Sequence, residues 1–188
     1  MTNLMRPDHA VFTQRNNALH PDETCWPTSV VQALHIRDVK MPEGKYEQPE
    51  DNLTHFCMTD KYVQHSWQEH DPSRNYKPWQ VHIVLCEAIN RWIGYNVAER
   101  KVFNGDRDLR RFLDAGRCVV ISGRFPYYSG APINHAICVC GYTDEGYIIC
   151  DPWGDYKTLY SDGSRCARGN LMPYKDFRDY MKTSCIII

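Results

Sequence analysis

Apolar residues recur at helical spacing in three segments of the first two thirds of the chain: 28–36, 77–94 and 106–116. We predict a helix over each segment, because this spacing gives a helix one apolar face. Gly94 and Gly116 follow the last apolar positions of the second and third segments, as is common at helix C-termini.

The first of these helices is predicted to begin beside a cysteine, in the sequence DETCWPTSVV. Thr24 is a candidate N-cap, and Pro27 suits a first helical turn, where its missing N–H leaves no hydrogen bond unmade. Cys25 is therefore expected at the N-terminus of this helix.

From residue 95 onward, alternating or continuous apolar runs predict strands. The segments are 95–103, 117–122, 135–142 and 146–151. The sequence TDEG between the last two is a turn signal, so we predict a hairpin there. A short helix is expected over 173–181, and the final CIII favours a last strand. Helices followed by an antiparallel sheet indicate an α+β fold.

The segment 38–76 is polar and rich in Pro, His and Asp. We interpret it as a polar insertion of irregular structure, with one short helix around His65. Since the chain contains no repeat and no obvious linker, residues 1–188 are predicted to form a single domain.

The composition limits the classes of partner. The chain has 188 residues, of which 43% are hydrophobic, and a formal net charge of −1. This charge provides no basic field for nucleic acid and no polybasic patch for a membrane surface. No run of about 18 apolar residues predicts a membrane span. The first residues lack the apolar core of a secretory signal, so we expect cytoplasmic synthesis, with release on lysis as a further possibility.

Three residues are candidates for nucleophilic catalysis. A thiolate is stabilised at a helix N-terminus and beside a protonated imidazole, and Cys25 is expected at such a helix start. His135 opens the first strand of the predicted hairpin, and Asp151 closes the second, so both are expected at its open end. Asp151 is then placed to orient the imidazole of His135 and to support its charged form.

With these residues identified, the chain resembles a papain-like cysteine peptidase of the C39-like group. The sequence TQRNN…PDETCWPTS (13–29) resembles the segment of that group that carries the nucleophile. The sequence CVVISGRFP…NHAICVCGYTDEGYIICDPWGDY (118–156) resembles its apolar strand, the following loop and its His…Asp segment. Together the two segments cover about a third of the chain, in the order typical of the group.

The resemblance implies a papain-like fold, in which a helix bearing the nucleophile packs on an antiparallel sheet. It implies Cys25 as the nucleophile, His135 as general base and acid, and Asp151 as the residue that orients His135. An oxyanion hole would combine the backbone N–H of Cys25 with the side-chain amide of Gln14, for which Asn17 is the alternative. No cofactor is required.

Aromatic side chains near these residues are candidates for substrate contacts, although packing is an equal alternative. They are Trp26, Tyr127, Tyr128, Trp153 and Tyr156, and Asn17 is a further candidate for substrate binding. A metal site is not predicted, since the chain has no C-x(2–4)-C knuckle of the kind that binds structural zinc. Six cysteines fall in apolar patterns or beside them and are interpreted as reduced core residues: Cys57, Cys86, Cys118, Cys138, Cys140 and Cys150.

The substrate expected from the resemblance is an amide bond in a peptide. The stem peptide of a bacterial cell wall, as cleaved by a phage or bacterial lysis enzyme, is slightly favoured by the small single-domain format. Processing of an intracellular protein is the alternative. A non-catalytic binding protein that keeps the fold, or an acyltransferase with the same residues, also stays open at this point. The segment 38–76 is a candidate for setting substrate choice.

Overall fold

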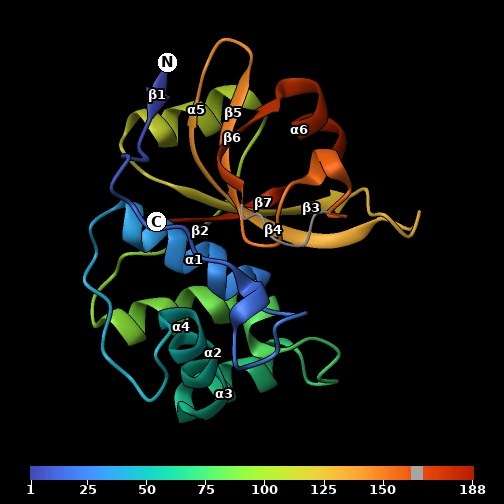
Figure 1. The fold of residues 1–188 in the computed structure, drawn as a ribbon. Helices are drawn as coiled ribbons and strands as arrows, with labels where there is room; N and C mark the ends of the chain where they lie inside the picture. The colour runs from blue at the N-terminus through green and yellow to red at the C-terminus, as the bar shows by residue number, and fades with distance from the viewer. Residues whose placement is uncertain (162–166) are drawn as a thin grey trace.

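A computed structural model describes residues 1–161 and 167–188 and shows a helical half packed against a sheet (Figure 1). The α-helices are α1 (Cys25–Ile36), α2 (Pro49–Thr59), α3 (Lys61–His70), α4 (His82–Ile93), α5 (Asp106–Asp114) and α6 (Tyr174–Tyr180). The strands are β1 (Thr2–Asn3), β2 (Glu99–Val102), β3 (Val119–Phe125), β4 (Ile133–Tyr142), β5 (Gly146–Asp151), β6 (Ala167–Pro173) and β7 (Met181–Ile187). Short 3-10 turns are η1 (Gln14–Asn16), η2 (Pro78–Gln80) and η3 (Tyr156–Thr158).

The sheet is antiparallel, with the strand order β2-β7-β3-β4-β5-β6 and with β1 paired to β4. Helices α1 to α4 lie on one face of the sheet, and α5 and α6 lie on the other (Figure 1). A separate hydrophobic core fills each side. Because both faces are covered, β3, β4 and β5 are buried almost throughout, which explains their continuous apolar runs. The α+β class is thus confirmed.

Helix α1 lies at the centre of the molecule, between the sheet and the other helices of its half. Val30, Val31 and Leu34 are fully buried, as is typical of a helix with apolar residues on most of its surface. The hydroxyl of Ser29 donates to the carbonyl of Ala136 on β4 at 3.1 Å, which fixes the first turn of the helix against this strand. The N-terminus of α1 is therefore held next to the start of β4.

The segment 38–76 is more regular than its sequence indicates, since α2 and α3 occupy much of it. A few of its polar residues are buried, and among them Asp51 makes tertiary hydrogen bonds. Asp51 accepts the backbone N–H groups of Ala18 (2.8 Å) and Leu19 (2.9 Å), so α2 holds the loop that leads to Cys25. The short helix expected around His65 is confirmed as α3, whereas the irregular structure expected over 49–59 was wrong, because the buried polar residues of α2 make such contacts.

The other predicted elements are confirmed with small shifts. The hairpin of β4 and β5 has the expected turn, and the last strand is β7, which also takes in residues before CIII. The helix predicted over 77–94 begins only at His82, because η2 occupies the first residues. Strands β1 and β6 were not predicted. None of the helices among the described residues is both long and apolar enough to cross a membrane.

Candidate active site

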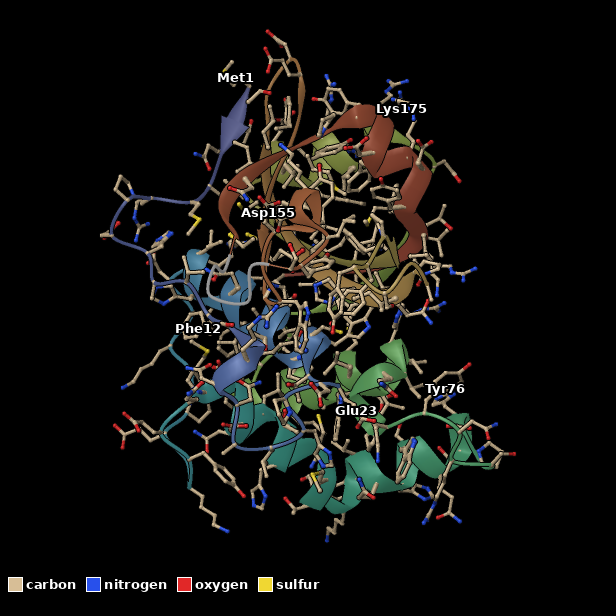
Figure 2. All side chains as sticks on the ribbon, turned by 45° about the vertical axis from the view of Figure 1, so that its right-hand side comes forward. Met1, Phe12, Glu23, Tyr76, Asp155 and Lys175 are labelled. Carbon is tan, nitrogen blue, oxygen red and sulfur yellow. The ribbon has the colours of Figure 1, made fainter. Side chains whose placement is uncertain are left out.

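Three side chains from three elements meet where the helical half faces the sheet. Cys25 is the first residue of α1 and is partly exposed. His135 lies near the start of β4, and Asp151 is the last residue of β5. In Figure 2, Glu23, two residues before Cys25, lies on the helical side, and Asp155, four residues after Asp151, lies on the sheet side.

The imidazole of His135 lies between the carboxylate and the thiol. Its Nε2 is 2.6 Å from Oδ1 of Asp151, and both side chains are buried, with 3% and 1% of their surface exposed. Since Nε2 bonds the carboxylate, Nδ1 is the ring nitrogen left for the hydrogen bond with the Cys25 thiol. The predicted contact between His135 and Asp151 is present, and Cys25 interacts with the same imidazole.

The charge of Asp151 determines the protonation of His135. Burial lowers the pKa of His135, but the negative charge of Asp151, the hydrogen bond to it and the interaction with Cys25 raise it, and the result is a pKa of about 10. At neutral pH the imidazole is therefore protonated. A protonated ring next to a thiol favours the thiolate, which is the reactive form of cysteine.

Asp151 is itself held by two donors. The hydroxyl of Tyr160 donates to Oδ2 at 3.0 Å, and the backbone N–H of Trp153 donates to Oδ1 at 2.9 Å. Tyr160 is buried, and burial together with the adjacent carboxylate raises the pKa of its hydroxyl, so it stays a donor. These bonds satisfy a buried charge that would otherwise be costly.

Two aromatic rings fix the plane of the imidazole. Phe125 on β3 meets the ring of His135 at a centroid distance of 5.5 Å and an angle of 78°. Tyr160 meets it at 5.7 Å and 73°. Both contacts are edge-to-face, the preferred geometry of aromatic pairs. Tyr160 thus contacts both the base and the carboxylate, and sequence reasoning missed it, because it lies in a turn with positive φ (59°) that no pattern indicated.

Cys25 and His135 open into a pocket of about 450 Å³. The pocket brings together predicted and unpredicted residues, which are Gln14, Asp22, Cys25, Tyr127, Ile133, Asn134, His135 and Trp153. Asp22 adds an acidic group that the sequence analysis had not singled out. A further unpredicted residue, Arg15, supports the wall: its Nε donates to the carbonyl of Trp153 at 2.6 Å, and its guanidinium lies 4.3 Å from the indole centroid.

Gln14 is the amide that the structure brings to the pocket. Its side chain is buried, and its Nε2 donates to the carbonyl of Pro21 at 2.7 Å. Its Oε1 accepts no hydrogen bond from any residue in 1–161 or 167–188. The backbone N–H of Gln14 donates to the carbonyl of Pro152 at 3.1 Å, which ties η1 to the segment that follows Asp151.

Three predicted contacts lie outside this pocket. The amide of Asn17 is buried against the hydroxyls of Thr24 (2.8 Å) and Thr28 (3.2 Å), where it fixes the loop before α1. The indole of Trp26 packs on the imidazole of His82 at 4.3 Å and is buried between the elements. Tyr128 is exposed and stacks on Tyr127. Asn17 and Trp26 therefore pack in the interior, and Tyr128 lies on the surface outside the pocket.

The other described cysteines are all buried, so Cys25 differs from them in access as well as in position. Burial raises the pKa of the Cys57 thiol to about 12 and that of Cys86 to about 11. The interpretation of the six singled-out cysteines as core residues is confirmed by their burial. Within the described ranges, no three His, Cys, Asp or Glu side chains are grouped closely enough to hold a metal ion.

A thiol at the start of a central helix, facing an imidazole on an adjoining antiparallel sheet, is the arrangement of the papain-like fold. The model of the Peptidase_C39 like family matches residues 8–171, and the chain belongs to this family. Membership indicates peptidase activity. Among solved structures, a protein from Bacillus anthracis designated a C39-like peptidase shares the fold, with a TM-score of 0.54, 14% identity, and coverage of 96% of this chain and 94% of that one. No curated protein matches the sequence significantly.

The Tyr160–Asp151 bond can be tested by removing one oxygen atom. We expect Tyr160→Phe to lower the free energy of unfolding by about 1.5–3 kcal/mol, the usual contribution of a hydrogen bond to a charged group. Urea unfolding measures this change. Tyr156→Phe is the matched control, because Tyr156 lies in the same core as Tyr160 but its hydroxyl donates to the less buried Asp176 (3.1 Å), away from Asp151. Equal losses in both variants would contradict a special role for Tyr160.

Proposed function

We propose that this protein is a cysteine peptidase that hydrolyses an amide bond of a peptide through Cys25, His135 and Asp151. The observation that carries the proposal is the buried 2.6 Å contact between His135 and Asp151, together with the interaction of the same imidazole with Cys25 in one pocket. An imidazole held between a carboxylate and a thiol has the geometry of an activated nucleophile.

The first half of the reaction forms an acyl-enzyme. The thiolate of Cys25 attacks the carbonyl carbon of the scissile bond, and the carbonyl oxygen takes up the negative charge. The protonated His135 then gives its Nδ1 proton to the leaving nitrogen as the C–N bond breaks. A free amine departs, and a thioester to Cys25 remains. Asp151 stays ionised throughout and keeps the ring in position.

The second half releases the acyl group. The now neutral His135 takes a proton from a water molecule, whose oxygen attacks the thioester carbonyl. The C–S bond breaks, a carboxylic acid leaves, and the thiolate and the imidazolium are restored. Because Asp151 holds a positive charge on His135 at neutral pH, the resting pair after this step is again charged and ready for another attack.

The oxyanion would be stabilised by two N–H donors. One is the backbone N–H of Cys25, which has no acceptor within the helix because it belongs to the first turn of α1. The other is Nε2 of Gln14, which has a second hydrogen besides the one it donates to Pro21. Both residues line the same pocket, which supports Gln14 over Asn17 for this role.

The substrate class follows from the walls of the pocket. Tyr127 and Trp153 provide apolar surface for a side chain, and Asp22 provides a carboxylate that attracts an amino group. Lysine-containing peptides and the diamino acids of bacterial stem peptides both carry such a group. A cell-wall stem peptide, as cleaved by a lysis enzyme, is therefore the first substrate to test, and an intracellular protein is the second.

Limited alkylation tests the proposal before any substrate is known. We expect iodoacetamide at pH 6 to modify Cys25 at least about tenfold faster than any other described cysteine, because a thiolate paired with an imidazolium persists at a pH where ordinary thiols are protonated. Peptide mass spectrometry measures the rates. His135→Ala should abolish the difference.

The alternatives give other results. Equal labelling of Cys25 and the buried cysteines would favour a binding protein that keeps the fold without the chemistry. If Cys25 is reactive and acyl adducts accumulate when an amine is added together with a substrate, the enzyme is an acyltransferase rather than a hydrolase.

A further inference from the structure

A second pocket, of about 560 Å³, lies between the helical half and the sheet. We call it the basic pocket, and its lining residues are His70, Asp71, Tyr76, Gln80, Val81, His82, Ile83, Arg100 and Lys182. The pocket shares no lining residue with the pocket of Cys25. The first seven of these residues come from the helical half, including the end of the segment 38–76, and the last two come from β2 and β7.

Two cations in this pocket have no counter-ion among the described residues. Arg100 and Lys182 form no ion pair with any residue of the described parts of the chain, whereas Lys101, next to Arg100, pairs with Glu99. Asp71 is the carboxylate in the wall, but it is largely buried and its Oδ2 already accepts the backbone N–H of Tyr76 at 2.8 Å. The charge of the pocket is therefore positive, and an incoming anion meets at least two free donors.

His82 extends this set of donors. Its Nδ1 lies 3.1 Å from the hydroxyl of Ser184, so Nε2 is the ring nitrogen available to a ligand. Burial first, and then the charges of Arg100 and Lys182, lower the pKa of His82 to about 4, so the ring is neutral at pH 7. A bound anion would offset both charges and would raise this pKa again. The pKa of His82 is therefore expected to change when an anion binds in the pocket.

The N-terminus of α4 adds further positive potential to the pocket. His82 and Ile83 are its first two residues, and their N–H groups have no intrahelical acceptor. The N-cap residue Val81 has no side chain that could bond them. These N–H groups add to the positive potential in the pocket, most of which comes from the side chains of Arg100 and Lys182.

The basic pocket is linked to the candidate catalytic residues through neighbouring residues on both walls. On the helical wall, the ring of His82 contacts Trp26, the residue after Cys25, at a centroid distance of 4.3 Å. On the sheet wall, Gly123 pairs with His135 on one side and with Met181, the residue before Lys182, on the other. A peptide bound at Cys25 can therefore reach the basic pocket within a few residues.

We propose that the basic pocket binds a carboxylate of the peptide substrate, either the C-terminal carboxylate or an acidic side chain, a short distance from the scissile bond. Arg100 and Lys182 would bind the carboxylate directly, and Nε2 of the neutral His82 ring would donate a further hydrogen bond to it. This inference rests on the proposed peptidase function and specifies its substrate: a peptide with an anionic group on one side of the cleaved bond.

Binding can be measured without turnover. In the Cys25→Ala protein, the imidazole resonances of His82, assigned with His82→Gln, are titrated with pH by NMR. A short peptide with a free C-terminal carboxylate should raise the pKa of His82 by about one unit or more, and the same peptide with a C-terminal amide should not. An unchanged pKa with the carboxylate peptide would overturn the proposal. A shift with inorganic phosphate but not with the peptide would assign the pocket to free phosphate and would also overturn it.

Kinetics separate this inference from the peptidase function. We expect Arg100→Gln to lower kcat/KM about tenfold for carboxylate-bearing peptides and to leave their amidated forms within about twofold, as for the loss of one charged hydrogen bond. Lys101→Gln is the matched control, since it removes the neighbouring charge on β2 outside the pocket. If both peptide forms are cleaved and Arg100→Gln affects neither selectively, the inference fails and the peptidase function stands. If neither is cleaved while the pKa of His82 still shifts, the peptidase function fails and the pocket is an anion site without a substrate role.

Discussion

Cys25→Ser is expected to lower kcat for peptide hydrolysis by at least about 10⁴-fold, the scale of loss when a catalytic nucleophile is removed. Serine keeps the size of the side chain at the start of α1, so the fold should not change. Its hydroxyl, however, is far less acidic than a thiol, and His135 already carries a proton at neutral pH and cannot accept another. Steady-state kinetics on the substrate found by screening measures the effect.

Cys86→Ser is the control for this experiment. Cys86 is buried in α4, away from the pocket of Cys25, so its substitution should reduce stability without a comparable loss of kcat. A Cys25→Ser protein that keeps more than a few per cent of the wild-type kcat would show that another group is the nucleophile. A parallel loss in both variants, with unfolding in both, would point to stability instead.

Asp151 variants are expected to show the second large effect, on the pH dependence of activity. In the mechanism we propose, the imidazole of His135 must be protonated to hold the thiolate and to protonate the leaving amine. Activity is therefore present below the pKa of His135, about 10, and is lost as the pH rises through it. In Asp151→Asn the negative charge is gone and burial, which lowers this pKa, dominates. The alkaline limb of kcat/KM should then move down by more than one pH unit.

Asp151→Ala separates charge from position. It removes the acceptor for Nε2 of His135 as well as the charge, so kcat should fall by about 10²-fold, the usual cost of a misplaced catalytic group. Asp151→Asn retains an acceptor and should lose less at the acidic end of its profile. The comparison requires kcat/KM from pH 5 to 10. An unchanged alkaline limb in Asp151→Asn would show that another group sets the protonation of His135.

The contact between His135 and Asp151 was predictable because it depends on local sequence. The turn TDEG fixes the hairpin, and the hairpin fixes which residues of β4 and β5 share its open end. The position of Cys25 was predictable for a similar reason, since Thr24 and Pro27 mark the start of α1. In both cases a few neighbouring residues contain the necessary information.

The supporting residues could not be predicted, because their positions depend on contacts between distant segments. Tyr160 reaches Asp151 only after a turn in which Leu159 and Tyr160 both adopt positive φ, and neither residue type favours that conformation. Asn17 and Gln14 are similar amides three residues apart. The amide of Asn17 bonds hydroxyl groups near the start of α1, whereas Gln14 lines the pocket. The sequence contains no signal for this difference.

The same limit applies to α2. Glu50, Asp51 and Asn52 form a polar run of the kind that usually marks a loop, yet all are buried in the helix. The partners of Asp51 and Asn52 lie in loops before α1 and before α2 itself, so the hydrogen bonds that stabilise these two residues exist only in the folded chain. Polarity alone therefore misled the prediction for this part of the chain.

The place of β7 in the sheet has a consequence for biosynthesis. The ribosome has made Cys25, His135 and Asp151 once residue 151 is complete, but β7 lies between β2 and β3, and β3 in turn pairs with the strand of His135. Until residues 181–187 have been made, the sheet lacks the strand that joins β2 to β3. A nascent chain would thus contain all three candidate catalytic residues before the sheet that carries His135 and Asp151 is complete.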